Sequence, residues 1–279
     1  MPYSAELSRT NPTAIVFMID QSSSMAEPFG AQPEKPKAQG VADGINCLLQ
    51  NLVLKCAKSD GIRDYFHVGV LGYGARVAWM LGGPMAGQKL SPISTVANNP
   101  LRVEQRSRKL DDGAGGLVEQ KFKFPVWFDA AAAGRTPMCQ AMTEVTNVAK
   151  VFLEHFPDCF PPLIINISDG KATDGNPELP SYNLKNLASS DGNVLFFNAH
   201  LSATQARPIE FAASETELAE PEAHILFKMS SVLPPKLQDA ARNEGFRVEP
   251  TTRGFVFNAD LVAVIRFLDI GTRAAQVLR

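Results

Sequence analysis

The stretch AIVFMIDQSSSM, residues 14–25, decides the fold of this chain. Its first six residues are apolar, and a run of this kind is typical of a buried strand. Three oxygen-bearing side chains follow at alternating positions, Asp20, Ser22 and Ser24. In open α/β sheets the carboxyl ends of the strands line the ligand crevice, so these side chains can direct their oxygens at one point. Mg²⁺ prefers oxygen ligands and retains several waters, and the pattern therefore predicts a site for a hard cation.

Two later segments carry the same kind of chemistry. The sequence GRTP, residues 134–137, opens a strongly periodic helical pattern, and IINISDG, residues 164–170, is a second apolar strand that ends in an acid. Together the three segments supply two carboxylates and three hydroxyls to the same edge of one sheet. A plainer interpretation stays open, because Asp, Ser or Thr at such positions often caps the following helix. Thr136 in particular directly precedes a proline at a helix start.

These segments resemble the von Willebrand factor type A (vWA) domain. Its metal-ion-dependent adhesion site (MIDAS) is built from D-x-S-x-S, a later Thr and a later strand-end Asp, and the resemblance runs over nearly the whole chain. It implies that Ser22, Ser24 and Thr136 touch Mg²⁺ or Mn²⁺, while Asp20 and Asp169 act directly or through water. It also implies that one coordination position takes an acidic side chain of a protein partner.

A narrower resemblance concerns SDGKATDG, residues 168–175. This segment looks like the bacterial vWA branch associated with tellurium resistance, in which S-D-G-x-x-T-D is frequent. The resemblance implies a stress-response setting and a partner such as a kinase or phosphatase encoded nearby.

The composition is that of an ordinary soluble chain. Of its 279 residues, 45% are hydrophobic and 20% are charged, and the net charge is −2. The chain lacks the basic excess of a nucleic-acid binder, so no nucleic-acid partner is expected. The first residues show no secretory signal pattern, and no apolar run is long enough to cross a bilayer. The expected location is therefore the cytoplasm, without a membrane partner.

Strand-like and helical patterns alternate along the chain, which is typical of a doubly wound sheet. Strands are expected at 14–19, 66–72, 76–80, 163–168, 193–200 and 223–228. Helices are expected from Lys37 onward, from Pro137 to Phe156, from Pro235 to Asn243 and from Asp260 to Val277. We therefore expect a single α/β, vWA-like domain over residues 1–279. Its mostly parallel, Rossmann-like sheet should have six strands, with helices on both faces.

Residues 81–133 do not fit this alternation and are expected to form an insertion near the metal site, because loops of this length usually carry structure or function. Apolar and polar residues alternate over 118–128, which predicts a strand with one apolar face. Pro125 makes that strand an edge strand or an irregular one. The insertion also carries a basic cluster that is either a solvated face or a partner-binding patch: Arg102, Arg106, Arg108 and Lys109.

Three functions are compatible with these residues. The favoured one is a metal-dependent protein-interaction module, with no catalytic residue. The second is a Mg²⁺-dependent phosphohydrolase of the haloacid-dehalogenase type, in which a strand-end Asp attacks phosphorus. That family has an acid two residues after its nucleophile, where this chain has Ser22, and neither G-x-S-x-G nor G-x-x-x-x-G-K-[ST] is present. The third is a metal-independent scaffold that binds through residues 81–133.

Overall fold

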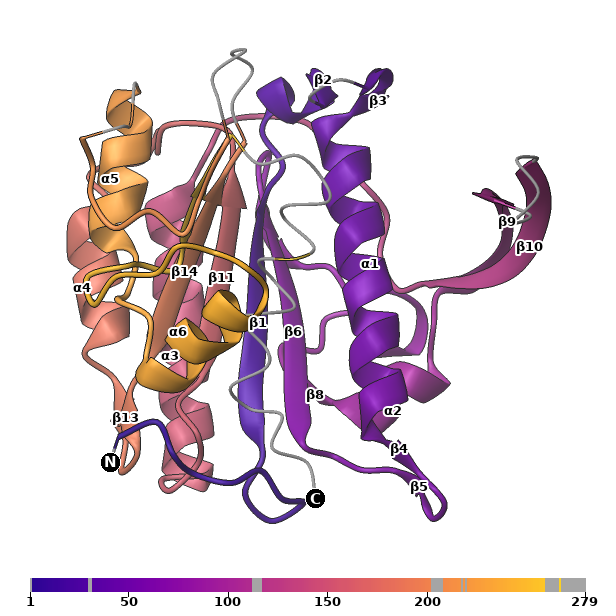
Figure 1. The fold of residues 1–279 in the computed structure, drawn as a ribbon, viewed down its shortest axis with the longest axis horizontal. Coiled ribbons are helices and arrows are strands. Elements are labelled where there is room, and N and C mark those ends of the chain that lie inside the picture. The colour runs from indigo at the N-terminus through magenta and orange to yellow at the C-terminus, as the bar shows by residue number, and fades with distance from the viewer. Residues whose placement is uncertain are drawn as a thin grey trace.

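The fold is built on one central sheet with helices on both faces (Figure 1). The computed structural model describes residues 2–29, 32–111, 117–201, 208–216, 218, 220–258 and 266. The sheet has eight strands in the order β15-β16-β14-β11-β1-β6-β7, and β8 also pairs with β6. Its parallel strands are β1 (Thr13–Asp20), β6 (Phe66–Tyr73), β11 (Leu163–Ser168), β14 (Leu195–His200) and β16 (Phe255–Phe257). Short antiparallel strands complete it: β7 (Val77–Trp79), β8 (Ser91–Pro92) and β15 (Ile209–Glu210).

The helices and the smaller hairpins surround this sheet. The described α-helices are α1 (Lys37–Cys56), α2 (Ile93–Asn98), α3 (Met138–His155), α4 (Glu178–Lys185), α5 (Pro221–Met229) and α6 (Pro235–Asn243). Two 3-10 turns are η1 (Ser23–Ala26) and η2 (Gly83–Met85). Separate two-stranded pairs are formed by β2 (Pro28–Phe29) with β3 (Gln32–Pro36), β4 (Ala57–Lys58) with β5 (Gly61–Ile62), β9 (Arg102–Asp111) with β10 (Leu117–Val126), and β12 (Ala188–Ser189) with β13 (Gly192–Asn193). None of the described helices combines the length and the apolar character that a membrane span needs.

Strand β1 has apolar residues on both sides because both faces of the sheet are covered. Ile15 and Phe17 belong to the core cluster that includes α1 and α6, whereas Val16 and Met18 belong to the cluster with α3, α4 and α5. Alternate residues of a strand point to opposite faces, so a continuous apolar run is required here. The predicted class, a doubly wound and mostly parallel α/β sheet with helices on both faces, is confirmed.

The topology indicates where a ligand would be expected, at the end of β1. The chain goes from β1 to β6 on one side and later returns to β11 on the other side. The point at which the direction of winding changes therefore lies between β1 and β11. Ligands of open α/β sheets bind at the carboxyl ends of the strands at such a switch point.

Residues 223–228, expected as a strand, lie in helix α5 instead. Ala223, Leu226 and Phe227 are buried on one side of that helix, at the helical spacing of three and four residues. Pro221 occupies the first turn, where the missing amide hydrogen costs no bond. The outer parallel strand is β16, and short antiparallel strands raise the total to eight rather than six. The helix expected from Asp260 to Val277 lies outside the described residues, apart from residue 266.

Residues 81–133 contain the long hairpin of β9 and β10, which projects from the body of the molecule on the side of α1 (Figure 1). The strand expected over 118–128 is β10. Pro125 lies in this separate pair rather than in the central sheet, where a missing amide hydrogen would break a ladder. At the base of the hairpin, Trp127 and Phe128 are buried in the core that includes α1.

Candidate metal centre

Strand β1 delivers Asp20 to the carboxyl edge of the sheet. All residues of the strand are buried, and Asp20 itself is 0% exposed. The chain stays attached to β6, because the Gln21 amide donates to the Tyr73 carbonyl at 2.7 Å. The amide of Ser22 then donates to Asp20 Oδ1 at 2.8 Å, so the loop folds back over the acid.

A chain of hydrogen bonds joins four of the five predicted site residues. The hydroxyl oxygens of Ser22 and Ser24 are 3.0 Å apart, and Ser24 Oγ donates to Asp169 Oδ1 at 2.9 Å. Asp20 joins this chain through the Ser22 amide. The structure therefore brings together two acids and two hydroxyls from segments almost 150 residues apart, since Ser24 and Asp169 are separated by 145 positions. Their role as metal ligands stays a prediction.

Thr136 approaches the same edge from the loop before α3. Ser23 holds that loop, since its amide donates to the Gly134 carbonyl at 3.1 Å and its hydroxyl accepts the Gly134 amide at 3.1 Å. Gly134 has φ +87°, and a Cβ there would lie 2.5 Å from the Ala75 backbone, so this turn requires glycine. Thr136 is 5% exposed, and its hydroxyl oxygen lies 3.9 Å from the position that a Cβ on Gly170 would occupy. Thr136 is thus next to the loop that carries Asp169.

Thr173 and Asp174 of the segment SDGKATDG hold it against Thr136 and the start of α3, respectively. Thr173 Oγ1 accepts the Thr136 amide at 3.0 Å, and the Thr173 amide donates to the Thr136 carbonyl at 2.9 Å. Asp174 accepts the amides of Cys139 and Gln140 at 3.1 and 2.8 Å, so it caps the first turn of α3. The capping role considered for Thr136 is therefore performed by Asp174, a residue that the sequence analysis did not assign. The position of Asp174 in the S-D-G-x-x-T-D motif was the sequence signal that could have identified this residue.

Burial dominates the electrostatics of Asp20. It raises the pKa of this carboxyl above its usual value, although hydrogen bonds from Ser168 and Ser22 act in the opposite direction. Ser168 Oγ donates to Asp20 Oδ2 at 2.7 Å, so each carboxylate oxygen accepts one bond. Tyr73, fully buried nearby, has its pKa raised by burial and by the charge of Asp20.

Lys37 is a second residue of the site that the sequence analysis did not assign. It is the first residue of α1 and is 1% exposed, and its ammonium lies 2.8 Å from Asp169 Oδ2 and 3.0 Å from Glu27 Oε2. Burial lowers the pKa of Lys37, but the bonds to the two carboxylates outweigh it and the pKa lies above its usual value. A signal did exist, because a basic residue at a helix start opposes the helix dipole and is unusual without a partner.

The donor set fits a hard divalent cation. Within the described ranges, Asp20 accepts bonds from a hydroxyl and an amide, without an ion pair to a basic side chain. A buried carboxylate in that situation is costly unless a cation compensates it. The described residues contain no group of three or more His, Cys, Asp or Glu suited to a metal, so the coordination would depend on hydroxyls. Mg²⁺ tolerates such a set because it keeps part of its water shell.

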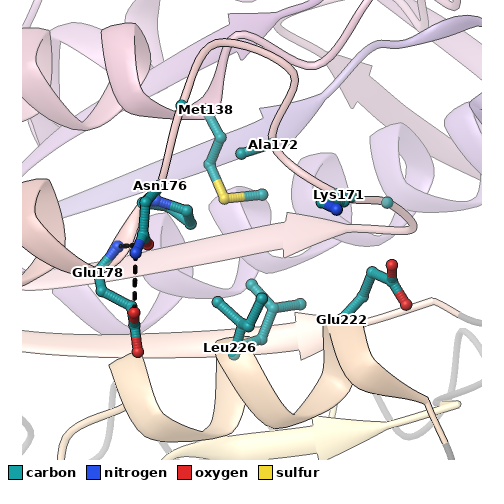
Figure 2. A pocket seen from close by; sticks show the side chains of 11 residues that line it. Met138, Lys171, Ala172, Asn176, Glu178, Glu222 and Leu226 are labelled. Carbon is teal, nitrogen blue, oxygen red and sulfur yellow. Dashed lines mark hydrogen bonds between the residues drawn. The ribbon is translucent and has the colours of Figure 1, made fainter.

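A cavity of about 280 Å³ lies directly beside this centre, between the loop after β11 and helix α5. Figure 2 shows Met138 and Leu226 extending toward its interior, while Lys171 and Glu222 lie at one side of it. Gly170, next to Asp169, also lines the cavity. The surface around the candidate metal centre thus includes an apolar hollow with charged groups near it.

Solved structures are similar to this chain, although no protein-family model and no curated protein match it. Proximal thread matrix protein 1 from the mussel byssus has a TM-score of 0.50 at 13% identity, over 97% of this chain and 49% of that chain. A structure of that protein with a zinc-occupied MIDAS motif has a TM-score of 0.38 at 16% identity, over 70% and 37%. A von Willebrand factor type A protein from Catenulispora acidiphila has a TM-score of 0.45 at 12% identity, over 95% and 43%.

The likeness to the mussel protein shows a shared fold. The chain spans about half of that protein's length, 49%. The mixed α/β fold with a mostly parallel sheet is the one that the vWA resemblance implied.

Proposed function

We propose that this chain is a metal-dependent protein-interaction module. In this proposal Mg²⁺ or Mn²⁺ is held by Ser22, Ser24 and Thr136, and by Asp20 and Asp169 directly or through water. A partner protein supplies an acidic side chain to the metal. The observation that carries the proposal is the hydrogen-bond chain from Asp20 through Ser22 and Ser24 to Asp169 at the switch point of the sheet. The mussel protein of the same fold has zinc in its MIDAS motif, which is a precedent for a divalent cation.

The protein's own groups explain why a partner carboxylate would be needed. Two carboxylates and three hydroxyls balance at most the charge of the cation and leave coordination positions to water. The bound cation would supply positive charge at the surface, where an incoming carboxylate can replace a water. Hydroxyl ligands add no negative charge, so the site would attract an acid more strongly than an all-carboxylate site does.

The hairpin of β9 and β10 supports an acidic partner through one of its two faces. In the strand register, Lys109 lies opposite Glu119, and Lys121 and Lys123 follow on the same face. These three lysines are exposed, and we call them the outer basic face. Charge of this kind speeds association with an acidic protein and discriminates between partners.

The arginines of the basic cluster lie mainly on the other face and have internal roles. Arg106 stacks over the Phe124 ring at 3.7 Å and pairs with Asp43 of α1 at 3.0 Å. Arg102 pairs with Asp129 at 2.8 Å. Binding experiments on this insertion should therefore change the outer basic face, because changing Arg106 would also loosen the hairpin from α1.

A phosphohydrolase of the haloacid-dehalogenase type is less well supported by the geometry. An attacking Asp needs an accessible oxygen, whereas Asp20 is 0% exposed and both of its oxygens accept hydrogen bonds. The position two residues later holds Ser22, which cannot act as the general acid of that mechanism. Turnover of p-nitrophenyl phosphate with Mg²⁺ that disappears in Asp20→Asn would favour the enzyme over the binding module.

The proposed setting is a bacterial stress response in the cytoplasm, with a kinase or phosphatase encoded nearby as partner. It rests on the resemblance of residues 168–175 to the tellurium-resistance branch alone. The structure supplies a local reason for that motif, since Thr173 and Asp174 fix the loop of Asp169 against Thr136 and α3.

The test is a pull-down, in which partner proteins are captured on the immobilised protein with Mg²⁺ and are then eluted with chelator. Thr136→Ala is the diagnostic variant, and Thr143→Ala on the exposed side of α3 is its control, because the bond of Thr143 Oγ1 goes to the Cys139 carbonyl of its own helix. We expect a partner that elutes with chelator from the parent and from Thr143→Ala, and no capture by Thr136→Ala. Capture that persists in excess chelator would instead favour a metal-independent scaffold.

A further inference from the structure

The Lys37 ammonium is a buried cation within the candidate metal centre. Its 1% exposure is exceptional for a lysine, since lysines are almost never fully buried unless they are paired. It contacts two carboxylates of different character. The side chain of Asp169 is 1% exposed, whereas that of Glu27 is 54% exposed.

Its position is not explained by helix α1. Lys37 is the first residue of that helix, where the dipole disfavours a positive charge. Burial adds a desolvation cost, so only the pairing with the two carboxylates can hold the ammonium there. The backbone reinforces this arrangement, because the Lys37 amide donates to the Glu27 carbonyl at 2.9 Å.

We propose that Lys37 is the resident counter-ion of Asp169 and competes with the divalent cation for that carboxylate. Glu27 receives the ammonium when a metal binds. This inference rests on the proposed metal site and adds a regulatory element to it. Asp169 has one oxygen bonded to Ser24 and the other to Lys37, so a metal that engages this carboxylate meets the ammonium directly.

Two consequences follow from the charges. The metal must displace or tolerate a positive charge at hydrogen-bond distance, so its affinity for the free protein is reduced. A partner's carboxylate adds a negative charge to the same centre and offsets that repulsion. Metal binding and partner binding therefore strengthen each other, and the metal is retained best in the complex.

The experiment is a calorimetric titration of the whole chain with Mn²⁺. Lys37→Met removes the competing charge and keeps an unbranched side chain of similar reach. Lys35→Met is the matched control, because Lys35 lies two residues away and pairs with Asp43 at 2.7 Å instead. We expect the Mn²⁺ affinity to rise about tenfold or more in Lys37→Met and to change by less than about twofold in Lys35→Met.

The outcomes separate this inference from the proposed function. If the parent binds Mn²⁺ and Lys37→Met binds it equally or more weakly, the competition is wrong and the metal site stands. If the parent does not bind Mn²⁺ and Lys37→Met does, the competition is supported in its strongest form. Absence of binding in both folded proteins overturns the metal site and the competition together.

A second variant keeps the test valid if Lys37→Met does not fold. Glu27→Gln keeps the size of this half-exposed side chain but removes the negative charge that would hold the ammonium away from Asp169. We expect a Mn²⁺ affinity about threefold or more below that of the parent. Glu178→Gln is the control, because Glu178 lines the neighbouring cavity and bonds to Asn176. An unchanged affinity in Glu27→Gln would show that the ammonium does not transfer to Glu27.

Discussion

Replacing Asp174 by Ala should loosen helix α3 and the loop of the candidate metal centre together. Asp174 accepts the amides of Cys139 and Gln140 at 3.1 and 2.8 Å. Loss of a helix cap of this kind costs about 1–2 kcal/mol. For a chain of this size, that corresponds to a fall in Tm of about 2–8 °C in a thermal unfolding experiment.

The same variant should make Cys139 more reactive. The pKa of this thiol is raised to about 11 by burial first and by the nearby charge of Asp174 second. Removing that charge lowers the pKa, and the uncapped helix start then favours the thiolate further. The rate of alkylation by iodoacetamide at pH 8, measured in a Cys47→Ser background, should increase several-fold.

Glu178→Ala serves as the control for both measurements. Glu178 is an exposed acid near the same loop, and its carboxylate accepts a bond from Asn176 rather than from α3. Its Tm and its alkylation rate should stay close to those of the parent. If Asp174→Ala matched the parent in both quantities, the assignment of Asp174 as the clamp between the motif and α3 would be refuted.

Three further predictions concern charge. Burial raises the pKa of Asp43, but its pairs with Lys35 and Arg106 outweigh this and hold the pKa below its usual value. The contribution of this carboxylate to stability is therefore complete above about pH 3.9, the pKa in the unfolded chain, and is lost as the pH falls through the lower pKa of the folded state. In urea unfolding from pH 5 to 3, the free energy of unfolding should decline less steeply in Asp43→Asn than in the parent. Changing the outer basic face to serines should slow association with an acidic partner and weaken its salt dependence in surface plasmon resonance, with stability within about 0.5 kcal/mol of the parent. In excess chelator, Asp20→Asn should be as stable as the parent or more stable by about 1 kcal/mol, because it removes a buried charge and keeps an acceptor for the Ser22 amide; a marked fall in Tm would assign Asp20 a purely structural role.

The strands and helices that depend on a local sequence pattern could be predicted from the sequence. The apolar run of β1 and the starts of α1 near Lys37 and of α3 after Pro137 depend on periodicity and proline position, and the structure has them there. Residues 223–228 were predicted wrongly, because a short apolar run fits a strand and a buried helix equally well.

The site was predictable only in part, because its charges are paired through the tertiary structure. Asp20, Ser22, Ser24 and Asp169 meet through strand order, which the alternating pattern of strands and helices indicates. The pairing of Lys37 with Asp169 spans 132 positions and depends on how the tertiary structure places the start of α1. No local pattern encodes such a distance, and the same holds for the division of the hairpin into an inner and an outer face.

The most direct test of the central claim is the anomalous scattering of Mn²⁺ in crystals of the protein. Crystals soaked in millimolar Mn²⁺ should show one strong anomalous peak at the carboxyl edge of β1, with the hydroxyl oxygens of Ser22 and Ser24 at about 2.1 Å from it. Crystals of Asp20→Asn combined with Asp169→Asn should lack that peak under the same conditions. A parent structure whose strongest peak lies elsewhere, or a peak that persists in the double variant, would contradict the assignment of these residues as a metal centre.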